Sequence, residues 1–573
     1  MIELQDHRIF SLHSLSVAAG KEPGGRFSEL VKQPLIGQGR LPGGHAKAVP
    51  VPVWLPERCR AAAKGKYADM ALLQEKKRSC GDDLYEPVRQ LLSGEVPRLC
   101  RIYSLADAFR RFLENGVLYE ESTPPEERYQ YKLAMVLSDA ARKRVEKEMA
   151  DRAVPDQFLM AKRKKDGRTA RTEFAVPVDI EDFDVYRFAT GRMVCKVSLK
   201  VAGLGDTQLP APVLTELINH VGRFAKLGWI EYPPSILVAQ QAKKKAGAEG
   251  EPTATPLTPA LLDDMDGFTL GSFVNRIVQG AGASTARTMR THTHAYAALG
   301  RESSGQRRTV LEEFGRKLAR QYTSDYALSV DADGIYSVTD FDNVVHILSR
   351  EGAASIVDPF VKGEEIPFLN GFRSGTFEKN YLPVSILNLH QHARSLDLLT
   401  LAVQKGDEAR ELDLAEDNLL LRDAISDERS ILSSWDKMQD DVTLLNSRFR
   451  FHQISAVSMH NRFSKAQRLA LGLDELEKQL SSDLADMSMR VQALVSMRSR
   501  LRQRRFDRWF GWVPILGSGV VAGIFFLEII TAFFDLRDSG KGFDALEIAA
   551  LAVTVVLIAS AMIFTYRQRR MQH

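Results

Sequence analysis

The stretch MVCKVSLKV, Met193–Val201, alternates apolar side chains with mostly polar ones. A period of two residues is typical of a β-strand that buries one face. The segments just before it, EFAVPVDI and DFDVYRF, predict neighbouring strands. Apolar residues then recur at helical spacing from Leu214 to Phe224, which predicts a helix packed on that sheet. Together these signals indicate an α+β fold, a mixed sheet with helices.

We place this α/β domain at residues 171–382. Within it, residues 239–263 are poor in apolar side chains and rich in Ala, Lys, Thr and Pro, as is typical of a flexible insertion. After the insertion, the pattern predicts helices at 310–322 and 342–350. Residues 1–170 form an N-terminal accessory region with a Pro- and Gly-rich opening, for which we expect a largely helical structure. A chain of 573 residues is long enough for at least two folded units.

The chain changes character after Pro383, because Pro514 is the only proline beyond it. Long helices are therefore permitted, and we assign residues 383–508 to a helical stalk or coiled coil. Apolar residues there recur at spacings of mainly three and four, close to a heptad repeat with one stutter. The residues of this seam are Leu473, Leu476, Leu480, Leu484, Met487, Val491, Leu494 and Leu501. An ordinary helical bundle is the alternative.

Two apolar runs follow the stalk, Trp512–Phe534 and Leu546–Tyr566. Each is long enough as a helix to cross a hydrocarbon core of ~30 Å. We therefore predict a first transmembrane helix at 509–535, an external loop at 536–545, a second transmembrane helix at 546–567 and a short tail at 568–573. Arginines precede the first run and follow the second, so both termini are expected in the cytoplasm, with the protein in the cytoplasmic (inner) membrane.

Glu528 lies inside the first apolar run. A carboxylate near the membrane centre costs about 2.5–3.5 kcal/mol, so it is expected to face a cavity, a bundle interior or a partner. At 100° per residue, the polar positions of this run share one stripe with small and apolar residues, and we predict that this stripe lines a pore. The stripe consists of Gly517, Val521, Ile524, Glu528, Thr531 and Asp535. The alternatives are that Glu528 reaches water at the outer surface or is protonated and hydrogen-bonded between helices.

Gly519 and Gly523 face away from this stripe and form a GxxxG pair, which allows another helix to approach closely. Two helices cannot enclose a channel, so a pore requires several copies of the chain around an axis. Asp535 and Asp538 would then form acidic rings at the pore mouth, although Arg537 and Lys541 oppose them.

A cytoplasmic α/β domain, a long helical stalk and two C-terminal spans resemble the CorA-type family of divalent-cation transporters. The resemblance covers residues 173–573 in outline and is strongest from FHQISAVSMHNRFSKAQRL, Phe451–Leu469, to the end. It implies a funnel-like homopentamer whose first span lines the pore, and a divalent cation such as Mg²⁺ as the candidate ion. The family's Gly-Met-Asn triplet is missing, because the corresponding place reads FFDLRDSG, Phe533–Gly540. The architecture is retained, and the identity of the ion is left open.

These observations predict an ion channel or transporter, selective for cations and gated by its cytoplasmic domain. The alternative is a membrane-anchored effector or sensor, acting in stress or anti-phage defence. In that case the soluble domain binds a ligand or partner, and the hairpin perturbs the membrane or only anchors the chain. Neither the regulatory ligand nor a protein partner can be named from the sequence.

Other motifs point to no further chemistry. The basic run Lys162–Arg171 is interpreted as an exposed loop, and we expect no nucleic-acid partner. We expect no metal at His292–His294 or His390–His392, because histidines two residues apart point to different sides of a helix. P-loop, dinucleotide-binding, nucleophile-elbow and HExxH motifs are missing, so no enzymatic activity is predicted, although the N-terminal region is left open. The four cysteines lie far apart in the sequence and are interpreted as reduced structural thiols.

Overall fold

The computed structural model describes most of the chain up to Phe510. The described ranges are 2–17, 73–107, 110, 113, 130–149, 158–163, 169–202, 208–223, 226–232, 261–280, 286–321, 334–361, 363–415 and 421–510. Beyond them the described residues are Gly523, Ile524, Leu527, Glu528, Ile530, Thr531, Val555 and Ala559. The chain divides into two compact units, one of residues 1–404 and 433–483, the other of residues 405–432 and 484–573.

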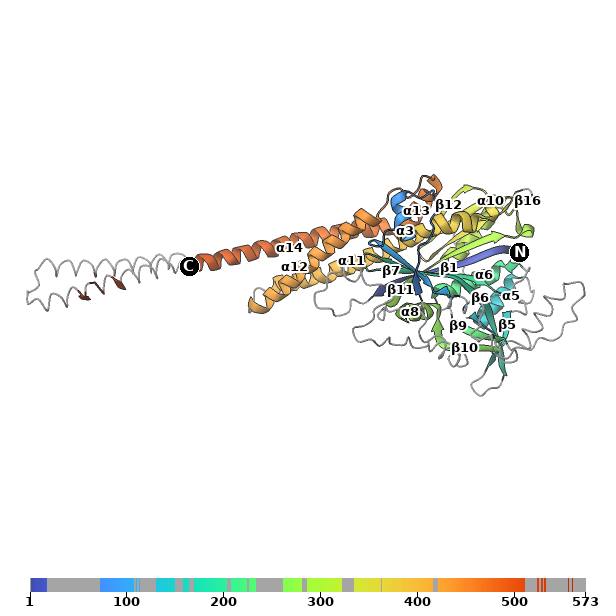
Figure 1. Ribbon diagram of the computed structural model, residues 1–573, viewed down its shortest axis with the longest axis horizontal. Helices are drawn as coiled ribbons and strands as arrows, with labels where there is room; N and C mark the ends of the chain where they lie inside the picture. The colour runs from blue at the N-terminus through green and yellow to red at the C-terminus, as the bar shows by residue number, and fades with distance from the viewer. Residues whose placement is uncertain are drawn as a thin grey trace, which may run out of the picture. The chain divides into compact units, whose positions relative to one another are not determined.

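The first unit is built on a large, mainly antiparallel sheet (Figure 1). Its strands are β1 (Glu3–Val17), β2 (Leu73–Glu75), β3 (Cys100–Leu105), β4 (Gln130–Leu137), β5 (Leu159–Arg163), β6 (Thr169–Phe188), β7 (Met193–Val201), β8 (Leu209–Pro210), β9 (Lys226–Tyr232), β10 (Leu261–Thr269), β11 (Ala286–Leu299), β12 (Tyr336–Phe341), β13 (Val344–Leu348) and β14 (Gly352–Val357). A separate short pair comprises β15 (Phe360–Val361) and β16 (Glu364–Glu365). The predicted strand Met193–Val201 is confirmed as β7.

Strand β1 lies in the middle of the sheet, between β11 and β7. The order then continues through β14, β13 and β12 on one side and through β6 on the other. The two segments EFAVPVDI and DFDVYRF form one long strand, β6, rather than two. The end of β6 pairs with β7 and β3, while its beginning pairs with β4 and β5. Strands β6, β4, β9, β10 and β5 thereby form a closed ring of pairings.

Helices cover both faces of the sheet and give three layers. The helical elements are α3 (Glu86–Ser93), α5 (Asp139–Glu148), α6 (Ala211–Arg223), α8 (Leu270–Gly280), η3 (Arg301–Ser303), α9 (Arg308–Arg320), α10 (Pro367–Asn370), η4 (Arg373–Tyr381), α11 (Leu382–Ala415), α12 (Leu421–Leu444), η5 (Leu445–Phe449), α13 (Ser458–Leu471) and α14 (Leu473–Phe510). In Figure 1, α11 and α13 lie on one side of the sheet, and α6 and α8 lie on the other.

The face under α5, α6, α8 and α9 holds the main apolar core. Side chains of all four helices join those of β1, β6, β7 and β11 in one buried cluster, with Trp229 and Phe273 among its largest members. The prediction of a helix behind the strand Met193–Val201 is confirmed by α6, and the helix predicted at 310–322 is confirmed by α9. The opposite face, under η4, α11 and α13, is lined by histidines, aromatic rings and charged groups, and we call it the polar face.

Two local predictions are wrong. The accessory region 1–170 is not largely helical in its described residues, because β1 to β5 contribute more of it than α3 and α5. Its first strand is central to the sheet, so it belongs to the same unit as the α/β domain. Within residues 342–350, Val344–Leu348 forms β13 rather than a helix, because β12 and β14 flank this segment and pair with its backbone. Most of the insertion 239–263 lies outside the described residues, and its last three residues open β10.

The prediction of helices after Pro383 is confirmed. Pro383 is the second residue of α11, which follows η4 without a break, so the proline lies at the boundary between a π-helix and an α-helix. Along α14 the seam residues Leu473, Leu480 and Met487 are buried at a spacing of seven. Leu476 and Leu484 are half-buried, and the side chains of Leu494 and Leu501 lie outside the described ones.

Among the described helices, none combines the length and the apolar composition that crossing a bilayer requires. Most of the two predicted spans, and the whole predicted external loop, lie outside the described residues.

Candidate functional site

Part of the predicted pore stripe falls within the described residues. Ile524, Glu528 and Thr531 are helical and exposed, and the Thr531 hydroxyl donates a hydrogen bond to the Glu528 carbonyl at 3.2 Å. Gly517, Val521 and Asp535 of the stripe, and Asp538 of the predicted mouth, lie outside the described residues. At 100° per residue the three described members remain within about 60° of one another.

The neighbouring side of this helix is apolar and also exposed. Leu527 is 67% exposed and Ile530 is 38% exposed. No described atom lies within 4 Å of the point where a Cβ on Gly523 would stand, so this glycine leaves room for another helix. Gly519, its predicted packing partner, lies outside the described residues.

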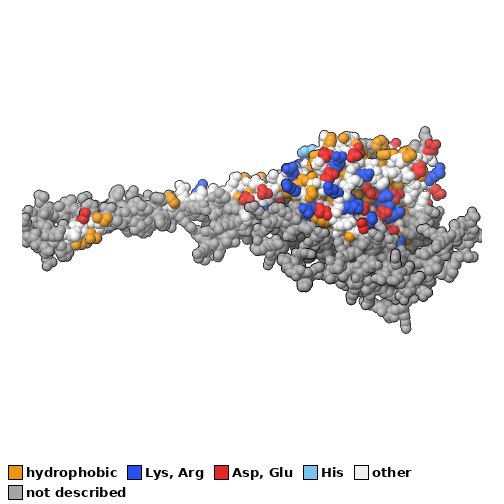
Figure 2. All heavy atoms as spheres, viewed as in Figure 1, with side chains coloured by type: hydrophobic (Ala, Val, Ile, Leu, Met, Phe, Trp, Pro, Cys, Tyr) orange, Lys and Arg blue, Asp and Glu red, His pale blue; other side chains and the backbone are white. Residues whose placement is uncertain are grey.

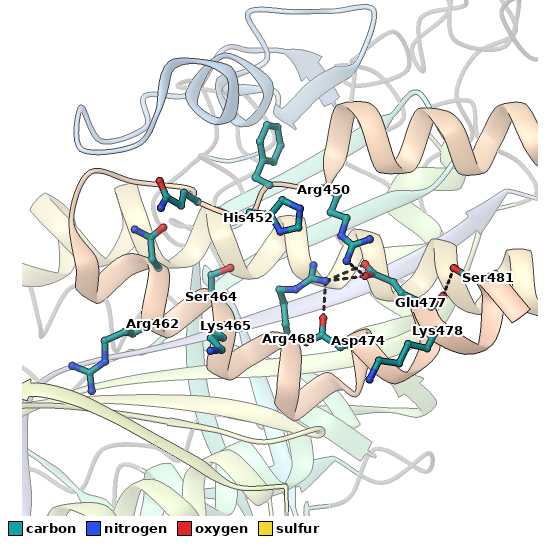
Figure 3. A pocket seen from close by; sticks show the side chains of 13 residues that line it. Arg450, His452, Arg462, Ser464, Lys465, Arg468, Asp474, Glu477, Lys478 and Ser481 are labelled. Atoms are coloured by element: carbon teal, nitrogen blue, oxygen red, sulfur yellow. Dashed lines mark hydrogen bonds and ion pairs between the residues drawn. The ribbon is translucent and has the colours of Figure 1, made fainter.

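A hollow of about 820 Å³ lies where α13 meets α14, and we call it the neck pocket (Figure 3). It is formed by the segment after η5, one side of α13 and the first turns of α14. Five of its lining side chains are cationic at neutral pH and two are carboxylates. The cationic residues are Arg450, Arg462, Lys465, Arg468 and Lys478, and the acidic ones are Asp474 and Glu477.

Two arginines converge on Glu477 in this pocket. Arg468 Nη2 lies 3.1 Å from both carboxylate oxygens of Glu477 and 2.9 Å from Asp474 Oδ1. Arg450 Nη2 lies 2.9 Å from Glu477 Oε2. Figure 3 shows both guanidinium groups directed at the same carboxylate. Because α13 carries Arg468 and α14 carries Glu477, these ion pairs fix the joint between the two helices.

Gly472 makes the joint possible. It ends α13 with a φ of 66°, in the left-handed region that glycine occupies without a steric cost. Leu473 then begins α14 at once. The chain therefore turns between two helices at a single residue.

Buried amides attach the joint to α11. Asn388 Nδ2 donates to Gln467 Oε1 at 2.9 Å, and Gln391 Oε1 accepts from Arg468 Nη1 at 2.7 Å. Gln391 also donates to the Phe449 carbonyl at the end of η5. These hydrogen bonds connect three segments of the first unit, α11, η5 and α13, through side chains that are buried or nearly so.

The polar face contains a buried group of charges that sequence reasoning missed. Asp184 is fully buried and receives Ser104 Oγ at 2.6 Å, Arg78 Nε at 3.0 Å and Lys196 Nζ at 2.7 Å. Burial raises the pKa of the Asp184 carboxyl, but the charges of Lys196 and Arg78 outweigh burial and leave that pKa below its usual value. These residues are distant in sequence: Ser104, Asp184 and Lys196 lie on the paired strands β3, β6 and β7, and Arg78 follows β2, which pairs with β3.

The histidine motifs occupy different settings from those expected. His292 and His294 lie on strand β11, so they share the polar face instead of pointing to different sides of a helix. His390 and His392 lie on α11; His390 stacks on Phe188 with ring centroids 3.9 Å apart. Among the described residues, no group of three or more His, Cys, Asp or Glu side chains is placed to hold a metal ion.

Three of the four cysteines are described, and all three are free thiols. Burial raises the pKa of the Cys80 thiol to about 12, and burial likewise raises the pKa values of Cys100 and Cys195. Thiols in this state are poor nucleophiles at neutral pH. Cys59 lies outside the described residues.

The surface of the first unit mixes both signs of charge. Figure 2 shows Lys and Arg side chains interspersed with Asp and Glu over the described part of the visible face. The basic run Lys162–Arg171 lies only partly within the described residues, where its ends belong to β5 and β6. The concentration of positive charge in the neck pocket is therefore a local feature of that joint.

Comparison of the chain with protein families finds no match, and comparison with curated proteins finds none either. The functional argument therefore depends on the residues themselves. The segment Phe451–Leu469, in which the family resemblance is strong, supplies eight of the thirteen lining residues of the neck pocket, although the sequence alone predicts no pocket there.

Proposed function

We propose that this chain forms a cation-conducting membrane protein of CorA-like architecture whose α+β domain controls opening. Several copies, five by the resemblance, would surround an axis in the cytoplasmic membrane with both termini in the cytoplasm. The observation that carries the proposal is the exposed polar stripe of Ile524, Glu528 and Thr531. A carboxylate in an apolar run requires an aqueous or polar partner, and symmetry-related copies of the same stripe supply both.

Each residue of the stripe has a distinct role in this proposal. Asp535 and Asp538 concentrate cations at the mouth, and Glu528 with Thr531 replaces part of their hydration shell. Val521 and Ile524 form an apolar constriction that closes by losing its water. The exposed Leu527 and Ile530, on the adjacent side of the helix, supply apolar surface for lipid or for a neighbouring copy. Gly519 and Gly523 allow a second helix to pack closely.

The neck pocket gives the domain a means of control. Helix α14 is continuous from Leu473 to Phe510, immediately before the first apolar run. Its first turns carry Glu477, which Arg450 and Arg468 hold in place. A ligand or partner that competes for these groups would release α14 from α13, and the change would reach the pore through one uninterrupted helix. This is the coupling that gating by the cytoplasmic domain requires.

Ion flux through reconstituted protein tests the proposal. Purified full-length chain in liposomes should pass monovalent or divalent cations, and Glu528→Ala should change the selectivity between cations and anions or reduce conductance several-fold. Ile530→Ala is the matched control, because Ile530 lies about 160° around the helix from Glu528. An intact selectivity and conductance in Glu528→Ala would remove this residue from the conduction path.

The second candidate is a membrane-anchored sensor or effector without a conducting path. The favouring observation is that the described pocket with the strongest cationic lining lies in the soluble unit, at the neck. In that case wild-type protein would remain in the membrane but pass no ions under any cation tested. The same liposome experiment therefore separates the two functions.

A further inference from the structure

A second cavity, of about 410 Å³, lies between the polar face of the sheet and α11. Strand β1 contributes Leu12 and Ser14, and the paired strand β11 contributes His292 and Arg290 opposite them. The turn before β7 adds Arg192, and the segment between β13 and β14 adds Arg350. We call this cavity the guanidinium pocket. Its lining shares no residue with the neck pocket.

Three guanidinium groups meet here with too few counter-charges. Arg192 forms two hydrogen bonds to Asp397, the one carboxylate among the lining residues. Arg290 Nη2 donates to the Arg350 carbonyl at 2.7 Å, and its Nη1 lies 3.3 Å from His392 Nε2. Among the described residues, no carboxylate lies within ion-pair distance of Arg290 or Arg350. The lining residues, three arginines and one aspartate, thus carry a net formal charge of +2, and the neighbouring carboxylate of Glu351 offsets part of the charge at Arg290.

Several buried polar atoms of the lining also lack hydrogen-bond partners within the described part of the chain. They are Nη1 of Arg192, which is 8% exposed, the Ser14 hydroxyl and at least one ring nitrogen of His292, which is 1% exposed. The Arg350 carbonyl, which accepts from Arg290, also acts on His292 as a hydrogen-bond acceptor, and it can serve at most one of the two ring nitrogens. Buried polar groups are normally satisfied, and several orphans around one cavity indicate a missing partner.

The charges of the histidines and arginines in the lining determine the charge of the ligand that the pocket can bind. Burial, with the nearby charge of Arg290, lowers the pKa of His292 to about 3, and the same two causes lower that of His392 to about 4. Both imidazoles are therefore neutral at pH 7, and the arginines alone carry the charge. Crowded guanidinium groups repel a metal cation and favour an oxyanion, which they bind with paired N–H donors.

We propose that the guanidinium pocket binds a small phosphate-bearing molecule. Arg192, Arg290 and Arg350 would contact the phosphate oxygens, with His292 and Ser14 as additional donors. The cavity is larger than a phosphate group requires and lies in the size range of small-molecule sites. Leu12, Leu389 and Leu396 line its remaining wall, so the rest of the ligand would be apolar or aromatic. This binding does not depend on whether the chain conducts ions.

Calorimetric titration of the full-length protein in detergent tests the proposal, with inorganic phosphate and phenyl phosphate as probes and benzyl alcohol as the uncharged comparison. Both phosphates should bind and compete with one another, with phenyl phosphate the tighter, and benzyl alcohol should not bind. Arg350→Gln, at an exposed position that tolerates substitution, and Arg290→Met should each weaken binding at least tenfold. Arg307→Gln, an exposed arginine before α9 and outside the pocket, should leave binding unchanged.

Two results would overturn the proposal. One is the failure of both phosphates to bind the wild-type protein. The other is equal affinity in wild type, Arg290→Met and Arg350→Gln. Either result can occur in a protein that conducts cations normally, so it is distinguishable from failure of the proposed channel function.

Discussion

Lys196 illustrates how this protein accommodates charge inside a sheet. Its side chain is 9% exposed, and its Nζ lies 2.7 Å from Asp184 Oδ2. Burial alone would lower the pKa of Lys196, but Asp184 and Asp182 outweigh burial and raise it. The group thus remains charged because its partners are charged. Removing one member of such a buried pair leaves the other member uncompensated.

We therefore expect Lys196→Met to destabilise the protein by about 3 kcal/mol. The apolar stem is retained in methionine, so most of the loss comes from the Asp184 carboxylate, which stays buried with only one of its two cations, Arg78. Lys143→Met, at an exposed position on α5, should change stability by less than about 0.5 kcal/mol. Guanidinium unfolding of both variants measures the difference. Equal stability of the two variants would show that Arg78 and Ser104 suffice for Asp184.

The buried histidines make stability depend on pH. Burial lowers the pKa values of His13, His346 and His390 to about 3, from an ordinary value near 6.5. Above pH 6.5 these histidines are neutral in both folded and unfolded chains. Below it, the unfolded chain takes up protons that the folded chain does not, so stability falls as pH decreases from 6.5 towards 3.

Each such histidine should contribute a slope of up to about 1.4 kcal/mol per pH unit in this window. Replacing His346 by Asn should reduce the slope of the unfolding free energy against pH by the contribution of this one histidine. The substitution also loses the 2.7 Å contact between His346 Nδ1 and Ser355 Oγ. Unfolding free energies between pH 7 and pH 4.5 give both slopes, and an identical slope in His346→Asn and wild type would contradict this account.

At the scale of elements, regular local patterns predicted some strands and helices correctly. In other segments, pairing with neighbouring strands produced a structure that the local pattern did not predict. The alternation in Met193–Val201 and the helical spacing near Leu214 identified β7 and α6. The local sequence of residues 342–350 does not determine their structure, because the strand in this segment depends on pairing with β12 and β14 at its two edges. His292 and His294 are predicted from the sequence to lie on a helix, whereas they lie on β11. No local pattern identifies this strand, because its partners β1 and β14 lie in other parts of the sequence.

The joint between α13 and α14 gives a prediction at this scale. Gly472→Ala should destabilise the protein by about 1 kcal/mol, because alanine is unfavourable at a φ of 66°. Crowding contributes little, since the nearest atom to the new Cβ is Glu475 Oε2 at 3.6 Å. Gly406→Ala, within α11 and with no described atom within 4 Å of the new Cβ, should instead stabilise by up to about 1 kcal/mol. Opposite signs in chemical unfolding are expected, and a stabilising Gly472→Ala would contradict the left-handed turn.

At the scale of the whole molecule, long-range pairing limited what the sequence could predict. Strand β1 lies between β7 and β11, nearly 200 and 300 residues away, so its central place could not be inferred from its own residues. The buried charges around Asp184 and the lining of the guanidinium pocket arise in the same way, from strands and a helix that only the fold brings together. The proposed pore stripe, by contrast, is a prediction from spacing within one short segment, and its described members Ile524, Glu528 and Thr531 are helical.

The central claim is that this stripe faces an axis shared by several copies of the chain. Imaging of the detergent-extracted full-length particle by electron microscopy tests it most directly, at a resolution that traces the helix carrying Glu528. The account predicts a symmetric assembly, of five copies by the resemblance, in which Glu528 and Thr531 of every copy point to the common axis. A single-copy particle, or an assembly in which Glu528 points outward to detergent, would contradict it.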